Sequence, residues 1–264
     1  MNNMEFCLDA VTKTYTEKNG VQIQALAPLT KTVAPGEFVA LIGPSGCGKS
    51  TLLYLAAGLL LPTSGRLYWR GAEKQPQTAM VFQQGGLFPW LTVAENVAFS
   101  LQDREFSQQE ITERVAQKLA RMQLSEFADA YPGSLSGGMR QRVGIARALV
   151  TEPDLLLMDE PFSALDAQTR RLLEDDLVQY WEELRPATLY VTHNIAEAVR
   201  LADVIWVFSP RPGRIVECLT VDIPRKERHQ LSARTQLAAL EETIWQEIKA
   251  GATAALTQGG RHDD

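Results

Sequence analysis

Residues 43–51 combine glycines, a lysine and three hydroxyl groups in an order suited to holding phosphate. They read Gly-Pro-Ser-Gly-Cys-Gly-Lys-Ser-Thr, which has the phosphate-loop form G-x-x-x-x-G-K-[ST]. In such a loop the lysine, here Lys49, reaches the β- and γ-phosphates, and the hydroxyl of Ser50 holds Mg²⁺. The predicted nucleotide contacts are Gly43, Pro44, Ser45, Gly46, Cys47, Gly48, Lys49, Ser50 and Thr51.

The elements on either side of this loop are those that would position it. A strand-like run, Phe38–Ile42, comes before the loop, and Leu52–Ala57 reads as a helix after it. The backbone N–H groups of a loop placed in this way can surround a phosphate, and the positive end of the helix dipole lies behind them. The sequence therefore predicts a nucleoside triphosphate site rather than a glycine-rich turn.

A second group of chemically useful residues follows a buried strand. Four apolar residues, Leu155–Met158, run directly into Asp159 and Glu160. Ligands bind at the carboxyl ends of strands in open α/β sheets. Adjacent strand residues point to different sides, so the two carboxylates can have different roles. We expect Asp159 to bind Mg²⁺, through water, and Glu160 to orient or deprotonate an attacking water. The alternative is that the pair simply caps the following helix.

A third motif, Leu135–Arg142, begins a helix that continues to Leu149. Ser136 is a good N-cap, and Gly137 and Gly138 leave the helix terminus open for a second contact with an anion. A Ser-Gly-Gly segment on its own is usually only a turn, because these residues dominate turns. Its meaning therefore depends on the motifs around it.

Taken together, the three motifs resemble those of the ATP-binding cassette (ABC) ATPases, over about residues 5–220. The resemblance implies ATP and Mg²⁺ as ligands, with Gly43–Ser50 as Walker A, Leu155–Glu160 as Walker B and Leu135–Arg142 as the signature segment. It also implies roles for four further places in the chain. These are Gln83 as the Q-loop glutamine that senses metal and water, Ser163–Asp166 as the D-loop, His193 as the switch histidine at the γ-phosphate, and Tyr15 as the aromatic stacked on adenine.

For two of these residues a structural explanation stays open. His193 could be a strand-end histidine without a role, and Tyr15 could be a packing residue. The catalytic set implied by the resemblance is Glu160, His193 and Gln83, and the metal set is Ser50, Gln83 and Asp159. Asn194 stands where many family members have Asp, and an Asn can still cap the following helix.

The resemblance also implies partners. Cassettes pair head to tail, so that the phosphate loop of one subunit and Ser136, Gly137 and Gly138 of the other hold one ATP. The second subunit would be an identical copy or a close paralogue. Residues 87–97 and 209–215 are similar to importers of the nitrate, sulfonate and taurine group. Leu87, Phe88 and Trp90 are expected to form a socket for a short permease helix.

This group implies a membrane permease, an indirect solute-binding protein, and a peripheral location on the cytoplasmic face of the cell (inner) membrane. The imported solute would be a small anion such as nitrate, a sulfonate or taurine. Three alternatives stay open: a soluble cassette in repair or translation, another cargo such as a thiamine precursor, and a small-molecule kinase. ATPase activity without an acceptor would separate a cassette from a kinase.

Composition limits the remaining possibilities. The 264 residues are 45% hydrophobic with a net charge of −6, which argues against disorder and against a general nucleic-acid binder. Three scattered cysteines indicate neither a disulfide framework nor a metal cluster. We see no signal peptide and no apolar run of about 20 residues. Because Cys47 precedes a helix, we expect a lowered thiol pKa and alkylation that blocks ATP binding.

Strands that alternate with helices predict an α/β fold with a parallel sheet and a helical subdomain inserted at about residues 90–150. The resemblance implies that this fold is of the P-loop NTPase type, with a mixed sheet core and an antiparallel β edge. We assign 1–220 to the ATPase domain and 221–264 to a short extension that contains a basic patch, Arg225–Arg228. The extension has a helix with Leu237, Leu240, Ile244 and Ile248 on one side, and a loose tail from Gly259 to Asp264. The expected strands are Phe6–Val11, Val21–Leu26, Phe38–Ile42, Arg66–Arg70, Ala79–Phe82, Leu155–Met158, Leu189–Val191 and Val204–Phe208, the last closing the sheet.

Overall fold

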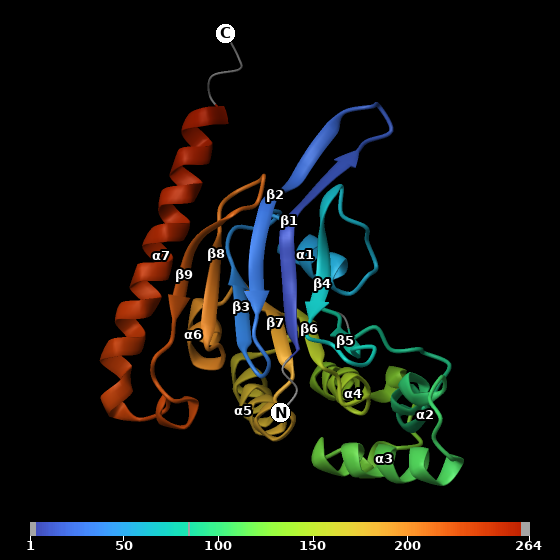
Figure 1. The fold of residues 1–264 in the computed structure, drawn as a ribbon. Helices are drawn as coiled ribbons and strands as arrows, with labels where there is room; N and C mark the ends of the chain where they lie inside the picture. The colour runs from blue at the N-terminus through green and yellow to red at the C-terminus, as the bar shows by residue number, and fades with distance from the viewer. Residues whose placement is uncertain (1–3, 84, 260–264) are drawn as a thin grey trace. The chain divides into compact units, whose positions relative to one another are not determined.

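The computed structural model of the chain describes residues 4–83 and 85–259, and it separates into two compact units. One unit consists of Met1–Lys74 and Ala187–Asp264, and the other of Gln75–Pro186. The expected tail from Gly259 to Asp264 lies outside the described residues beyond its first residue. The two units are described in turn (Figure 1).

The first unit has an antiparallel sheet of three strands in the order β2-β1-β4. These strands are β1 (Glu5–Thr16), β2 (Gln22–Val33) and β4 (Ser64–Arg70). The first two are longer than the sequence predicts. The turn between them is confined to Glu17–Gly20, where Gly20 N donates to Glu17 O at 2.9 Å. Tyr15 lies near the end of β1, opposite Ile23 of β2.

The second sheet of this unit surrounds β3 (Phe38–Ile42), whose five residues are all buried. Parallel strands β7 (Ala187–Val191) and β8 (Val204–Phe208) flank β3. The prediction that β8 closes the sheet is wrong, because β9 (Ile215–Thr220) pairs antiparallel along its outer side. In β9, half-buried and exposed residues alternate over only six positions, directly after a segment rich in Pro and Gly. So short a pattern in that place is not recognisable as a strand from the sequence.

Three helices of this unit accompany the second sheet, and one of them, α6, connects two of its strands, β7 and β8. They are α1 (Lys49–Ala56), α6 (Ile195–Leu201) and α7 (Leu231–Gly259), preceded by the short turn η4 (Arg225–Glu227). Helix α7, red in Figure 1, packs on α6 and β8. Its apolar side is the expected one: Ile244 is fully buried, and Leu237, Leu240 and Ile248 are half-buried.

The second unit pairs β5 (Thr78–Val81) in parallel with β6 (Leu155–Asp159). Between these strands lies the predicted helical block, and the long helix α5 (Ala167–Leu184) follows. Two helices of the block begin with capping boxes, Thr92 with Glu95 and Ser107 with Glu110, which fix their starts. The block contains α2 (Val93–Ala98), η1 (Phe99–Leu101), α3 (Gln108–Arg121), η2 (Ser125–Phe127), η3 (Pro132–Ser134) and α4 (Gly137–Leu149).

One side of α3 and its C-cap faces the interior, with Val115, Leu119 and Met122 buried and Ile111 half-buried. Within the described parts of both units, no helix is at once long enough and apolar enough to cross a bilayer.

Candidate functional site

The phosphate loop connects the buried strand β3 to α1, as the sequence predicts. Two of its glycines are required by close packing. Gly43 has φ 154°, and a Cβ there would lie 2.8 Å from the carbonyl oxygen of Phe208. Gly48 has φ 105°, and a Cβ there would lie 2.6 Å from Leu26 Cδ2. Since Gly48 is the N-cap and has no side chain, the first N–H groups of α1 stay available to an anion at the loop.

Lys49 is held over this loop. It is 6% exposed, and its ammonium donates to the carbonyl oxygens of Gly43 at 2.8 Å and Pro44 at 2.9 Å. These neutral acceptors fix the charge directly above the loop backbone. A phosphate oxygen would make a stronger, charge-assisted bond with the same ammonium.

Cys47 differs from the expectation. Its side chain is 1% exposed, and burial raises the pKa of the thiol although the nearby Lys49 charge opposes the shift. The expected lowering of the pKa is therefore wrong. Loss of hydration penalises the thiolate more than the helix terminus and the lysine favour it.

The Pro-Gly-Arg-Ile segment lies against the phosphate loop. Gly213 N donates to Ala25 O, and Ala27 N donates to Gly213 O, both at 2.9 Å. A Cβ on Gly213 would come within 1.9 Å of the carbonyl oxygen of Cys47. The sequence singled out this segment only as a family marker, and its glycine was the signal that the backbone passes close to another segment.

Tyr15 lies beside the first turn of α1. Its hydroxyl is 3.3 Å from Thr51 Oγ1, and the ammonium of Lys13 is 5.3 Å from the centre of its ring. The side chain is 38% exposed. The structure thus brings the predicted adenine-stacking residue to the phosphate-loop helix with its ring accessible.

His193 and the phosphate loop follow neighbouring parallel strands. Leu41 of β3 is paired with Val191 of β7, and Thr192 N donates to Leu41 O at 3.2 Å. His193 is exposed one residue later. Asn194 caps α6 by accepting from Glu197 N at 3.2 Å, so the expectation that Asn serves as a cap here is confirmed.

In the second unit, Gln83 and Glu160 also follow neighbouring parallel strands, β5 and β6. Gln83 Nε2 donates to Glu160 Oε2 and to Ser163 Oγ, both at 3.3 Å. Glu160 has a positive φ of 45°, a strained conformation for a residue with a side chain. Asp159, just before it, is 5% exposed. The structure therefore brings Gln83, Glu160 and Ser163 together in one hydrogen-bonded group.

The alternative that Asp159 and Glu160 cap the next helix is wrong. The N-cap of α5 is Asp166, whose carboxylate accepts from Gln168 N and Thr169 N at 3.0 Å each. These backbone hydrogen bonds lower the pKa of Asp166, and the bond from Thr169 N contributes most. Neither Asp159 nor Glu160 is therefore the N-cap of α5.

The signature segment begins α4. Ser136 is the N-cap and accepts from Met139 N at 3.2 Å. Ser136 and Gly137 are exposed. A Cβ on Gly138 would lie 2.9 Å from Thr169 Cγ2, so this glycine lets the start of α4 approach α5 closely.

The far end of α4 is tied to the loop that follows Gln83. The guanidinium of Arg147 donates to Gly86 O at 2.8 Å and to Gly85 O at 3.0 Å. Arg147 also lies over the ring of Phe88, 5.7 Å from its centre. It lines a cavity of about 720 Å³ whose other walls include Met80, Arg104 and Phe106. Sequence reasoning missed Arg147, because it is one arginine in a helix with several.

Trp90 projects from this loop and is 70% exposed. Its ring is 5.6 Å from that of Phe88, which is 4.5 Å from that of Phe99. The buried amide of Asn96 donates to the carbonyls of Phe88 and Leu91 at 3.1 and 3.0 Å and accepts from Phe88 N at 2.8 Å. The exposed aromatic surface therefore rests on a rigid loop. The sequence did not single out Asn96.

Comparison with known proteins places the chain in a family. The model of the ABC transporter family matches residues 26–163. The taurine import ATP-binding protein TauB of Rhizobium johnstonii is 42% identical over 238 residues, covering 87% of this chain and 91% of that protein. The nitrate import ATP-binding protein NrtD of Synechocystis sp. is 44% identical over 218 residues, 81% and 82% of the two chains. The aliphatic sulfonates import ATP-binding protein SsuB of Bacillus licheniformis is 45% identical over 210 residues, 78% and 81%.

A solved structure of the cassette MJ0796, a dimer in a post-hydrolysis state bound to ADP and Pi, is also similar. It superposes with a TM-score of 0.72 at 33% identity, covering 83% of this chain and all of that one. The chain belongs to the ABC transporter family and is an ATP-hydrolysing cassette of that family. The predicted α/β fold class is thereby confirmed.

Proposed function

We propose that this chain is the ATPase subunit of an importer that takes up a small anion such as nitrate, a sulfonate or taurine through a separate membrane permease. The names of its relatives favour this solute class. The observation that carries the transport role is the aromatic cluster of Phe88, Trp90 and Phe99, which is exposed at Trp90 and held rigidly by Asn96. Such a surface suits a short apolar helix of a partner.

The phosphate loop would hold ATP, with Lys49 on the β- and γ-phosphates and the ring of Tyr15 on adenine. Each unit has oxygen donors of the kind that Mg²⁺ binds: Ser50 in the first, and Gln83 and the buried carboxylate of Asp159 in the second. When bound, Mg²⁺ would neutralise charge on the phosphates. Ser50 and Asp159 would bind the ion, Asp159 through water, and Gln83 would contact it as the residue that senses the metal.

Hydrolysis itself would depend on the chain's own polar groups. Glu160 would accept a proton from the attacking water or orient it, and the 3.3 Å contact with Gln83 would keep the carboxylate directed. His193, exposed at the end of β7, would donate a hydrogen bond to the γ-phosphate. These roles rest on the family and on the local geometry of each unit.

We further propose that two cassettes, identical or closely paralogous, pair head to tail around ATP. Ser136 and Gly137 are exposed at a helix start, which suits a second phosphate contact made only in the pair. The similar MJ0796 cassette is dimeric. ATP would then hold the subunits together, and hydrolysis would release them.

The transport role is tested by isolating the tagged chain from detergent-solubilised membranes of its own cells. We expect membrane-spanning permease subunits to be recovered with it, and the complex to bind the cytoplasmic face of the inner membrane as a peripheral subunit. Recovery of the chain only in the soluble fraction, without a membrane protein, would favour a soluble cassette in repair or translation. Uptake by the reconstituted complex, with the solute-binding protein added, identifies the solute. Uptake of a thiamine precursor instead of an anion would replace the proposed cargo.

A further inference from the structure

Helix α6, which begins just after His193, is fixed at its first turn by a buried acid. Glu197 is 6% exposed. The hydroxyls of Tyr190 and Thr192 donate to its two carboxylate oxygens. Thr192 Oγ1 also accepts from Asn194 N at 3.0 Å, so the residues on both sides of His193 belong to one hydrogen-bonded group. The backbone that presents the imidazole is therefore held through Glu197.

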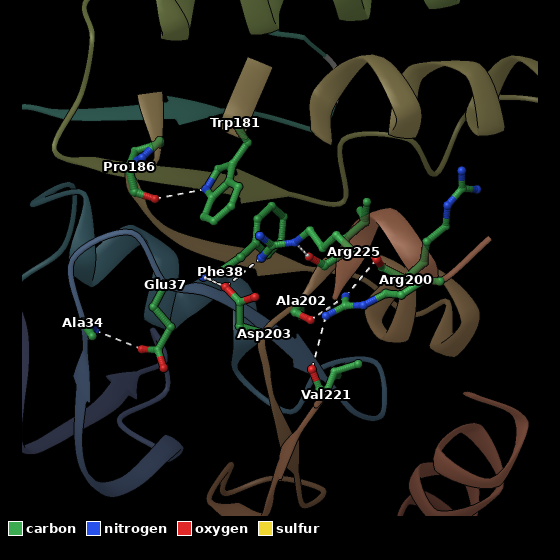
Figure 2. A network of polar contacts seen from close by, with 12 residues as sticks. Ala34, Glu37, Phe38, Trp181, Pro186, Arg200, Ala202, Asp203, Val221 and Arg225 are labelled. Atoms are coloured by element: carbon green, nitrogen blue, oxygen red, sulfur yellow. Dashed lines mark hydrogen bonds and ion pairs between the residues drawn. The ribbon is translucent and has the colours of Figure 1, made fainter. Parts of the chain in front are cut away.

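The other end of α6 is fixed by a buried base. Arg228 is also 6% exposed, and its Nη1 donates to three carbonyls at the end of the helix. These acceptors are Val199 O at 3.2 Å, Arg200 O at 2.9 Å and Ala202 O at 2.7 Å. Figure 2 labels two of these acceptors, Arg200 and Ala202. The other nitrogens of the guanidinium donate to Ile223 O at 2.8 Å and Val221 O at 3.3 Å.

Burial and the charge of Arg225 lower the pKa of Arg228 to about 10, which shows that the position is costly for a cation. The compensation is the negative end of the α6 dipole, because carbonyls without an intrahelical partner accept from the guanidinium. The negative Glu197 thus lies near the positive N-terminal end of the α6 dipole, and the positive Arg228 lies at its negative C-terminal end. A helix of only seven residues has little stability of its own, so these contacts determine where it lies.

The same C-terminal segment reaches the strand that leads to the phosphate loop. Arg225 donates to Leu201 O at 2.6 Å and pairs with Asp203 at 2.7 Å. Asp203 in turn accepts from Phe38 N, the first residue of β3, at 3.0 Å (Figure 2). Residues 225–228 therefore connect α6 to β3, although they lie outside the region matched by the family model.

We propose that Glu197 and Arg228 are positioning residues for His193: by fixing the two ends of α6 they set where the imidazole stands relative to the γ-phosphate. This inference rests on the proposed role of His193. By this inference, residues 221–228 contribute to ATP hydrolysis, because they hold the helix that positions His193. Displacement of a catalytic group by about 1 Å can cost about 100-fold in rate, so loosening α6 has a measurable effect.

The test follows the His193 resonance in the full-length protein with ¹³C-labelled histidine. The chain has three histidines, and the His193 signal is assigned with His193→Gln. In Arg228→Met bound to MgATP we expect this signal to shift and broaden, kcat to fall roughly 10- to 100-fold and the Kd for ATP to stay within about twofold. The matched control is Arg234→Met, which removes an exposed arginine of α7 and should leave all three values unchanged.

Arg228→Lys keeps the charge with fewer donors, and its kcat should lie between those of the wild type and Arg228→Met. If Arg228→Met does not fold, Glu197→Gln takes its place: the amide can accept only one of the two hydroxyl hydrogen bonds, so the His193 signal should again move. A folded variant with a lowered Tm but an unchanged His193 signal and kcat would overturn the inference. If His193→Ala instead hydrolyses ATP with the kcat of the wild type, the proposed role of His193 is overturned.

Discussion

Gly213 lies so close to Cys47 that a Cβ on the glycine would come within 1.9 Å of the Cys47 carbonyl oxygen. The contact joins the segment after β8 to the middle of the phosphate loop. Gly213→Ala must therefore move the loop or the segment. Overpacking of this kind costs about 1–3 kcal/mol, and if the loop moves, ATP affinity should fall about 5- to 150-fold.

Titration of Gly213→Ala with a fluorescent ATP analogue measures this loss. Gly133→Ala is the matched control, because a Cβ there meets nothing within 4 Å. Its affinity should equal that of the wild type. Wild-type affinity in Gly213→Ala would show that the segment, and not the loop, adjusts.

Glu160→Gln should bind MgATP but hydrolyse it very slowly, because the amide cannot accept a proton from water. The amide can still hydrogen-bond Gln83, which lies 3.3 Å from the carboxylate. We therefore expect a folded protein that sediments as a stable dimer with saturating MgATP. A variant that binds nucleotide yet stays monomeric would contradict the head-to-tail pair.

Complementation between two inactive chains tests whether the pair shares its sites. Lys49→Ala should abolish ATP binding at its own loop, and Ser136→Ala should abolish the contact made to a partner. A heterodimer of the two should regain one working site. ATPase activity is measured on mixtures in which heterodimers are shown by differently tagged chains. Inert mixtures with proven heterodimers would refute the shared site.

Trp90→Ala should leave basal ATPase activity largely intact and abolish its stimulation by the permease. The side chain is 70% exposed, so its removal should change the free energy of unfolding by no more than about 0.5 kcal/mol. Trp245→Ala removes a tryptophan that is 51% exposed on α7 and is the control. A parallel loss of basal and stimulated activity would make Trp90 a structural residue.

Cys47 should react slowly with a maleimide at pH 7, and the exposed Cys218 should react first. Burial raises the pKa of the Cys47 thiol, so the thiolate forms only above the ordinary thiol range of about 8.5. The thiol's contribution to stability is complete below the unfolded-state pKa and is lost as the pH rises through the folded-state pKa. Peptide mass spectrometry over time, at several pH values, measures both rates. Equal labelling at pH 7 would contradict a buried thiol.

The parts of the fold and site that could be predicted depend on local pattern. A run of five buried residues before a glycine-rich loop identifies β3 and its loop without any distant contact. Likewise, Leu155–Met158 and Ala79–Phe82 are short apolar runs, and each is followed by the polar residue that the motifs single out. Gln83 and Glu160 meet because parallel strands end at the same edge.

The parts that could not be predicted depend on single residues far apart in the chain. Arg225 and Arg228 belong to what reads as a basic surface patch, yet Arg228 is buried and the Arg225 side chain is only 6% exposed. Nothing in the run of charges shows that backbone carbonyls 25 or so residues earlier will accept their hydrogen bonds. The contact between Gly213 and Cys47 is of the same kind.

At Glu160, whose backbone is left-handed, the requirements of stability and of the proposed chemistry oppose each other. A residue with a Cβ pays roughly 1–2 kcal/mol to occupy this region, and glycine does not. A variant library screened only for heat resistance should therefore enrich glycine at position 160 and discard turnover in the same step. Backbone stability therefore favours glycine at position 160, whereas the proposed activation of water requires the carboxylate.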